Sequence, residues 1–196
     1  MTFRLGLTGS IGMGKSTTAG FFRDEAVPVW DADAAVHRLY APDGGAVAQI
    51  AQLCPQAVGS AGVSRETLKA AILADPALLA RIEAVVHPLV AADRASFAAA
   101  QKADLIVFDI PLLFEKGGEA EFDATLLVTA PATVQRARVL ARPGMTEDQF
   151  RLLLDRQMPD ASKRARATHI VETLEPEQTR AYIRALIRHI RGLQHA

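Results

Sequence analysis

Apolar and polar positions along the chain follow the patterns of strands and helices in turn. Five short runs rich in aliphatic and β-branched residues predict buried strands, at residues 3–8, 27–30, 104–110, 125–128 and 170–171. From Pro176 onward the apolar residues recur on one helical face, namely Ile183, Leu186, Ile187, Ile190 and Leu193. Strands that alternate with helices favour an α/β fold in which a five-stranded parallel sheet is covered on both faces.

The stretch between Ala34 and Gln101 is rich in alanine and contains no convincing strand. Its larger apolar residues recur at roughly helical spacing, and Pro76 and Pro88 interrupt them. We therefore expect several packed helices that break at these two prolines. Because ligands bind beyond the carboxyl ends of parallel strands, we expect functional residues directly after residues 8, 30, 108 and 128.

Composition narrows the class of protein without identifying it. The chain has 196 residues, of which 49% are hydrophobic and 22% charged, as is typical of a soluble globular domain. Its 22 basic and 22 acidic residues cancel, so no overall charge favours nucleic acid or a membrane as partner. The single cysteine, Cys54, forms no internal disulfide, and we expect it to be buried. We expect a cytoplasmic protein, monomeric or weakly homo-oligomeric.

Residues 9–16, Gly-Ser-Ile-Gly-Met-Gly-Lys-Ser, match the pattern of a phosphate-binding loop. Its glycines let backbone N–H groups point at a polyphosphate, and the following helix adds its positive end. Lys15 reaches the β- and γ-phosphates and the Ser16 hydroxyl binds Mg²⁺, whereas Met13 occupies an unconstrained position. The pattern predicts a nucleoside-triphosphate site made by Gly9, Ile11, Gly12, Met13, Gly14, Lys15, Ser16 and Thr17.

Two aspartates, Asp31 and Asp33, follow the second predicted strand. In an extended segment residues two apart point the same way, so both carboxylates would face the same region. One would accept a proton from a substrate hydroxyl and the other would hold Mg²⁺ through water. The alternative is that Asp33 caps a helix that starts at Ala34.

The third and fourth predicted strands also end near charged residues. Asp109 stands at the tip of the third and either orients Mg²⁺ or ties down the glycine loop through hydrogen bonds. After the fourth come Gln135, Arg138 and Arg142, which at offsets of three and seven would share one helical face. Such arginines stabilise charge on a transferring phosphoryl group, and the following Pro-Gly pair would hinge a lid. A scattered solvated surface is the alternative.

In this order the motifs resemble those of the dephospho-coenzyme A kinase family. The resemblance is carried by residues 7–17, 31–33, 82–90 and 111–115, and by Gln135, Arg138, Arg142, Gln157 and Lys163. The chain departs from the family at Thr173, where asparagine is common, and at Leu153, where arginine is common.

The resemblance implies a P-loop kinase core with two additions. Residues 1–34, 102–134 and 167–196 would form the nucleotide-binding core, residues 35–101 a helical coenzyme A domain, and residues 135–166 a small helical lid. The implied reaction transfers the ATP γ-phosphate to the ribose 3′-hydroxyl of dephospho-coenzyme A, with Asp33 as general base.

The resemblance also distributes roles among the candidate residues. Lys15 and Arg142 would act with Asp33 in catalysis, and Arg138 and Arg142 would contact ATP. Ser16, Asp31 and Asp109 would hold Mg²⁺. Asp33, His87 and Leu112 would meet the acceptor, although His87 could instead cap the end of a helix.

Two other functions compete with this one. A nucleoside or nucleoside-monophosphate kinase would phosphorylate a smaller acceptor, for which the insertion between Ala34 and Gln101 is oversized. A nucleotide-dependent switch would bind partners, but the chain has no guanine-reading Asn-Lys-x-Asp run and its paired aspartates would lack a purpose.

Overall fold

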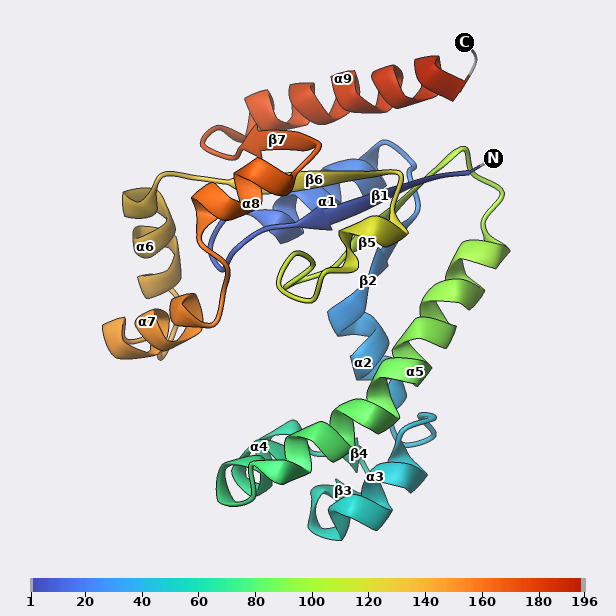
Figure 1. The fold of residues 1–196 in the computed structure, drawn as a ribbon, viewed down its shortest axis with the longest axis vertical. Helices are drawn as coiled ribbons and strands as arrows, with labels where there is room; N and C mark the ends of the chain where they lie inside the picture. The colour runs from blue at the N-terminus through green and yellow to red at the C-terminus, as the bar shows by residue number, and fades with distance from the viewer. Residues whose placement is uncertain (1, 195–196) are drawn as a thin grey trace. The chain divides into compact units, whose positions relative to one another are not determined.

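The computed structural model describes residues 2–194, which divide into two compact units (Figure 1). The first unit runs up to Trp30 and resumes at Gln101, and the second is Asp31–Ala100. None of the helices formed by residues 2–194 combines the length and the apolar content needed to cross a lipid bilayer.

A five-stranded sheet forms the centre of the first unit, with strand order β2-β5-β1-β6-β7. The strands are β1 (Phe3–Thr8), β2 (Val29–Asp31), β5 (Leu105–Asp109), β6 (Ala124–Thr129) and β7 (His169–Glu172). Parallel pairing joins β1 to β5 and to β6, and β6 to β7, so the predicted parallel sheet is confirmed. Every residue of β5 and β6 is buried, as expected where helices or loops cover both faces of a sheet.

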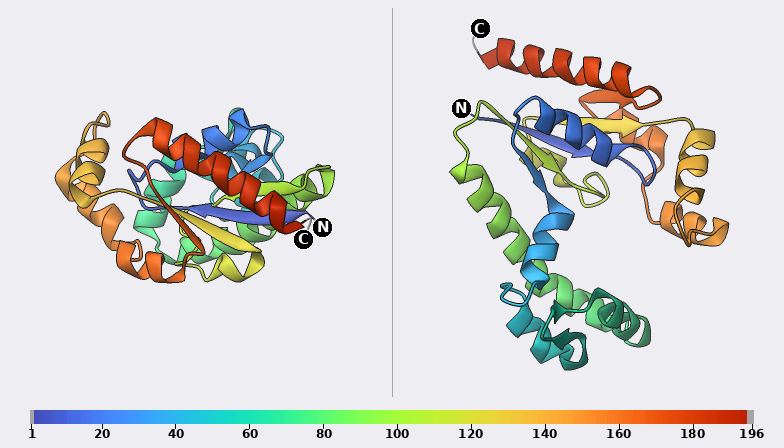
Figure 2. Two further views of the ribbon diagram at one scale, coloured as in Figure 1. Left: turned by 90° about the horizontal axis from the view of Figure 1, so that it is seen from above. Right: turned by 180° about the vertical axis from the view of Figure 1, so that it is seen from behind.

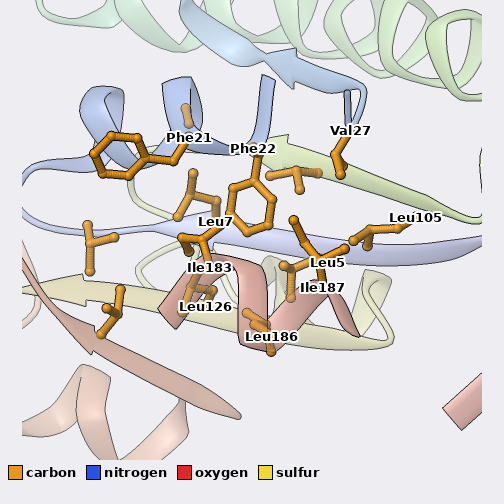
Figure 3. Close-up of a cluster of buried hydrophobic side chains, with 14 of the residues drawn as sticks. Leu5, Leu7, Phe21, Phe22, Val27, Leu105, Leu126, Ile183, Leu186 and Ile187 are labelled. Atoms are coloured by element: carbon orange, nitrogen blue, oxygen red, sulfur yellow. The ribbon is translucent and has the colours of Figure 1, made fainter. Parts of the chain in front are cut away.

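Helices α1 (Lys15–Asp24) and α9 (Pro176–Gln194) pack on each other and cover one face of this sheet (Figure 2). Figure 3 shows Leu5 and Leu7 of β1 facing Phe22 of α1 and Ile183 and Ile187 of α9. Four of the five apolar residues predicted on the α9 face are buried.

Leu193 is the exception, because it is 59% exposed. The preceding turn of α9 is held by Arg191, which pairs with Asp104 at 2.7 Å, just before the first residue of β5. Leu193 therefore belongs to the apolar sequence pattern of α9 but not to the buried core.

The opposite face of the sheet is covered by the chain that follows β5. A Cβ atom on Gly6 would lie 3.0 Å from Leu113 Cδ2 and 3.1 Å from the Phe122 ring, so glycine lets these side chains pack closely on β1. The Phe108 ring lies 5.4 Å from that of Phe122, with the short helix η2 (Gly118–Glu121) between Leu113 and Phe122 in the sequence.

Three further helices belong to the first unit: α6 (Ala132–Leu140), α7 (Glu147–Asp155) and α8 (Asp160–Arg166). A capping box formed by Thr146 and Gln149 starts α7. Arg136 of α6 pairs with Glu147 of α7 at 2.6 Å, which joins the two helices. In Figure 1 these helices lie at the end of the sheet where β1 and β6 terminate.

The second unit is mainly helical and has its own core. It contains α2 (Ala32–Tyr40), α3 (Val47–Leu53), η1 (Pro55–Ala57), β3 (Val58–Gly59), β4 (Gly62–Val63), α4 (Arg65–Ala74) and α5 (Ala77–Ala100). Buried side chains include Ile50, Leu68, Ile82 and Val86, and Cys54 is buried as expected.

Two predictions for the second unit are wrong. Strands β3 and β4 form an antiparallel hairpin, with Gly62 at φ +87°, in a stretch that we expected to contain no strand. Pro76 does separate α4 from α5, but α5 continues through Pro88. Proline's fixed φ is compatible with a helix, and the buried Val86 just before it keeps this part of α5 packed.

Candidate active site

The glycine loop connects β1 to α1 and leaves the amino end of that helix uncapped. Gly14 is the N-cap residue, no side chain caps the helix, and its first turn contains no acidic residue. Gly12 and Gly14 have φ values of +77° and +86°, which glycine adopts without strain. An uncapped helix start with a lysine as its first residue fits the phosphates of a nucleotide, since its N–H groups and dipole favour an anion.

The same glycines allow close packing against the neighbouring strands. A Cβ atom on Gly9 would lie 2.3 Å from Val128 Cγ2, and one on Gly14 would lie 2.7 Å from Thr173 Oγ1. At these two positions a larger residue would clash with the chain at the ends of β6 and β7, whether or not a ligand is bound.

Met13 is fixed in the middle of this loop. Its side chain is buried, and its Sδ accepts a hydrogen bond from the Ala130 N–H at 2.9 Å. Its carbonyl oxygen accepts a hydrogen bond from the Thr173 hydroxyl at 2.8 Å. The motif leaves the residue type at this position free, but in the structure the loop is tied through Met13 to the chain after β6 and β7.

Lys15 and Asp109, both predicted site residues, are brought together by the sheet. Leu7 of β1 is paired with Asp109 of β5, so the two strand ends lie side by side. The Lys15 ammonium forms an ion pair with the Asp109 carboxylate, which is only 2% exposed. This contact corresponds to the second of the two roles that we considered for Asp109, tethering of the loop. Coordination of Mg²⁺ by Asp109 stays a prediction.

Two glutamines hold the glycine loop at Ile11: Gln135 lies on α6, and Gln157 follows the end of α7. The Gln135 amide donates to the Ile11 carbonyl at 2.8 Å, and the Ile11 N–H donates to Gln157 Oε1 at 3.1 Å. These contacts border a cavity of about 470 Å³. The cavity is lined by Ser10, Met13, Gln135, Leu154, Asp155, Gln157, Met158, Pro159 and Asp160.

The two predicted arginines differ in their surroundings. Arg138 lies on α6 and donates hydrogen bonds to the Thr173 hydroxyl, at 3.1 Å, and to the Thr173 carbonyl. Arg142 lies beyond the end of α6 at Leu140, so the prediction that it shares a helical face with Arg138 is wrong. Its side chain is exposed and, among residues 2–194, makes no hydrogen bond or ion pair.

The family resemblance includes Lys163, but its burial and its contacts with the glycine loop were not predicted. Lys163 of α8 is only 1% exposed, and its Nζ lies 2.8 Å from Glu115 Oε1 and 3.0 Å from Ser10 Oγ. Burial raises the pKa of Glu115, but hydrogen bonds from Lys163 and from the Met158 N–H outweigh it, so the pKa is lowered. The sequence around Lys163 is polar and has the composition of an exposed helix, so no local signal marks it as buried.

In the second unit, the two aspartates stand in different local structures. Strand β2 ends at Asp31, and Asp31 Oδ1 accepts a hydrogen bond from the Ala34 N–H at 2.9 Å as the N-cap of α2. Asp33 lies in the first turn of that helix with an exposed side chain. Both the extended pair and an N-cap at Asp33 are therefore wrong predictions, because α2 begins at Ala32 rather than Ala34.

The two remaining candidates, His87 and Leu112, also differ in backbone setting. His87 lies in the middle of α5, exposed and 3.9 Å from a Glu83 carboxylate oxygen, so it does not cap a helix end. Leu112 of the first unit has φ +58°, a conformation that costs a non-glycine residue about 1–2 kcal/mol. The buried Leu113 and Phe114 that follow it hold this strained turn in place.

Among the residues that the structure describes, no group of three or more His, Cys, Asp or Glu side chains is arranged to hold a metal ion. Magnesium characteristically uses one or two carboxylates together with substrate phosphates and water rather than an all-protein cage.

Comparison with known proteins decides the family. The dephospho-CoA kinase family model matches residues 3–175. A dephospho-CoA kinase from Cereibacter sphaeroides is 66% identical over 189 residues, which cover 96% of each chain. This chain belongs to the dephospho-CoA kinase family.

Solved structures agree with that assignment at the level of the fold. The structure of TT1252 from Thermus thermophilus has a TM-score of 0.85 at 34% identity, covering 96% of this chain and 97% of that one. Dephospho-CoA kinase from Campylobacter jejuni has a TM-score of 0.72 at 18% identity, covering 97% and 98%, a likeness of fold alone. Members of the family are kinases with a nucleotide-binding P-loop fold, so the chain is a kinase that uses ATP. Membership of this family decides against a nucleoside or nucleoside-monophosphate kinase and against a nucleotide-dependent switch.

Proposed function

We propose that the chain transfers the γ-phosphoryl group of ATP to the ribose 3′-hydroxyl of dephospho-coenzyme A, giving coenzyme A and ADP, in the cytoplasm. The observation that carries this proposal is the uncapped amino end of α1, which starts at Lys15, in a chain of this family. The bond between the γ-phosphorus and its bridging oxygen to the β-phosphate breaks, and a bond to the 3′-oxygen forms.

The glycine loop and Lys15 bind the phosphates of ATP. The N–H groups at the start of α1 donate to phosphate oxygens, and Gly9, Gly12, Gly14 and Thr17 belong to the same loop and helix start. The Lys15 ammonium, which pairs with Asp109, neutralises charge on the β- and γ-phosphates. Fixed positive groups are effective here because the transferred group spreads its negative charge over three oxygens.

Magnesium binding is proposed for Ser16, Asp31 and Asp109. The ion, when bound, would supply positive charge that offsets the negative charge of the phosphates. Ser16 offers a hydroxyl on the first turn of α1, and its side chain is exposed. Asp31 and Asp109 each end a strand of the five-stranded sheet, β2 and β5, and offer carboxylate oxygens.

We assign the acceptor side of the reaction to Asp33, His87 and Leu112. Asp33 takes the proton of the 3′-hydroxyl, and its exposed carboxylate is accessible to a substrate. His87 is exposed on α5, and Leu112 stands in a strained turn after β5, a setting common at functional sites.

The lid proposed for residues 135–166 brings Arg138 and Arg142 to the transferred group. Arg142 is the better candidate for contact with the γ-phosphate, because its exposed side chain is not engaged by other described residues, whereas Arg138 is held by Thr173. Closing such a lid would exclude water and so suppress hydrolysis of ATP. In the same scheme, residues 35–101 form the coenzyme A domain.

A steady-state assay with ATP and several acceptors tests the proposed function. Dephospho-coenzyme A, adenosine, a nucleoside monophosphate and water alone would be compared, with ADP release and phosphorylated product both measured. We expect product from dephospho-coenzyme A at least about 100-fold faster than from the smaller acceptors, since their lost contacts also position the hydroxyl. Preferred phosphorylation of a nucleoside, or ADP release without any phosphorylated acceptor, would contradict the proposal.

A further inference from the structure

Lys163 is a buried cation that none of the proposed steps uses. Its side chain is only 1% exposed, and it lies on the short helix α8, more than 140 residues from the glycine loop in sequence. Burying an ammonium group is costly unless it is paired and hydrogen-bonded. Lys163 meets both conditions through Glu115 Oε1 at 2.8 Å and Ser10 Oγ at 3.0 Å.

The Glu115 side of this contact is firmly anchored. Glu115 is 13% exposed, and the same Oε1 atom also accepts the Met158 N–H at 2.8 Å. Two buried residues, Leu113 and Phe114, precede it and fix the turn after β5. Glu115 is therefore a rigid point against which the Lys163 ammonium is held.

The Ser10 side of the contact lies within the glycine loop. Ser10 is buried, and its carbonyl oxygen accepts the Met13 N–H at 3.1 Å, which forms the turn of the loop. Its hydroxyl accepts the hydrogen bond from Lys163. The side chain and the backbone of one loop residue are thus both constrained, and the constraint on the side chain comes from α8.

We infer that Lys163 is a positioning residue for nucleotide binding, which holds the glycine loop in its phosphate-binding shape through Ser10 and is itself held by Glu115. This inference rests on the proposed function for its kinetic consequences, but nucleotide affinity tests it independently. A loop that is not held must be ordered by the ligand, so part of the binding free energy is lost.

The experiment compares Lys163→Met with Arg164→Met, a matched loss of a cation from the same helix. Arg164 bonds to Asp160 at 2.6 Å and to Thr129 at 2.9 Å rather than to the loop. Affinity for ADP is measured by calorimetry and unfolding by urea. We expect Lys163→Met to weaken ADP binding and to raise the KM for ATP by about tenfold, the effect of losing a hydrogen bond from a charged donor. The KM for dephospho-coenzyme A should stay within about twofold, since that acceptor is bound elsewhere.

A double variant, Lys163→Met with Glu115→Gln, separates positioning from stability. Removing both charges leaves no unpaired carboxylate, so the free energy of unfolding should recover, while ADP binding should stay weak because Ser10 still lacks its donor. Recovery of ADP affinity together with stability would overturn the inference, as would equal ADP affinity in Lys163→Met and Arg164→Met.

If Lys163→Met alone does not fold, ADP binding by the double variant still tests the role of Lys163. The inference and the proposed function also fail in different ways. Absence of any phosphorylated dephospho-coenzyme A with the wild-type chain contradicts the function, whereas the ADP measurements address Lys163 alone.

Discussion

A single hydroxyl group, that of Thr173, connects the glycine loop to the chain after β7. It donates to the Met13 carbonyl at 2.8 Å and accepts from Arg138 at 3.1 Å, while the Thr173 N–H donates to the Thr129 carbonyl at 2.9 Å. Thr173 stands where the family often has asparagine. A hydroxyl that both donates and accepts can replace an amide in this position.

Thr173→Val tests whether that hydroxyl supports nucleotide binding. The substitution keeps the shape but leaves the Met13 carbonyl without its side-chain donor, so we expect a loss of about 1–3 kcal/mol in the free energy of unfolding and a higher KM for ATP. Thr179→Val is the control, because Thr179 is also buried but its hydroxyl donates to the carbonyl of Glu175, the residue before α9. A KM for ATP that rises equally in both variants would contradict this role.

Asp33→Asn tests the proposed general base. The amide keeps the size of the side chain but does not accept the 3′-hydroxyl proton, so we expect kcat to fall by about 10²- to 10⁴-fold. ADP affinity should be nearly unchanged, and Asp43→Asn, at another exposed aspartate of the second unit, should leave both quantities unchanged. Full activity of Asp33→Asn would remove the base from the mechanism.

Some site residues can be recognised from a short stretch of sequence, and others only from the folded structure. Residues 9–16 were predictable because the loop's spacing is set by the geometry of a phosphate group, and Asp109 because it ends a buried strand. The roles of Lys163, Gln135 and Gln157 at the loop depend on burial created by segments far apart in sequence. The hydrophobic pattern of a polar segment and the spacing of its residues do not indicate that burial.

At the scale of elements, α5 shows a proline inside a long helix. It spans Ala77–Ala100 and continues through Pro88, which is exposed. Because proline lacks the N–H that would bond one turn back, we expect Pro88→Ala to raise the free energy of unfolding by about 1–3 kcal/mol. Urea unfolding of the full chain measures this change. Lower stability of Pro88→Ala would show that the proline's restriction of the unfolded chain outweighs the missing bond.

The apolar strands β5 and β6, which are buried throughout, were the easiest elements to predict. The parallel sheet follows from the alternation of apolar runs with helices, although β7 contributes only the apolar pair Ile170 and Val171. The hairpin of β3 and β4 was missed because strands of two residues have no measurable alternation. The start of α2 was misplaced by two residues because both Asp31 and Asp33 are good capping residues, and only the backbone decides between them.

At the scale of the whole molecule, the buried pair of Lys163 and Glu115 makes stability depend on pH. The Glu115 pKa is lowered from 4.5 in the folded chain, so its contribution is fully present above that value and is lost as the pH falls through the folded pKa. We expect the stability difference between wild type and Glu115→Gln to shrink below about pH 4.5 in urea unfolding. A difference that stays constant between pH 7 and pH 3.5 would contradict the lowered pKa.

The central proposal is that the glycine loop binds ATP and that Asp33 takes the proton of the acceptor hydroxyl during phosphoryl transfer. Its most direct test is to identify the product made from ATP and dephospho-coenzyme A by phosphorus NMR and mass spectrometry, with the 3′-deoxy analogue as the matched acceptor. We expect one new phosphomonoester on the 3′-oxygen and no transfer to the analogue. Phosphate on another oxygen, or transfer to the 3′-deoxy analogue at a similar rate, would contradict it.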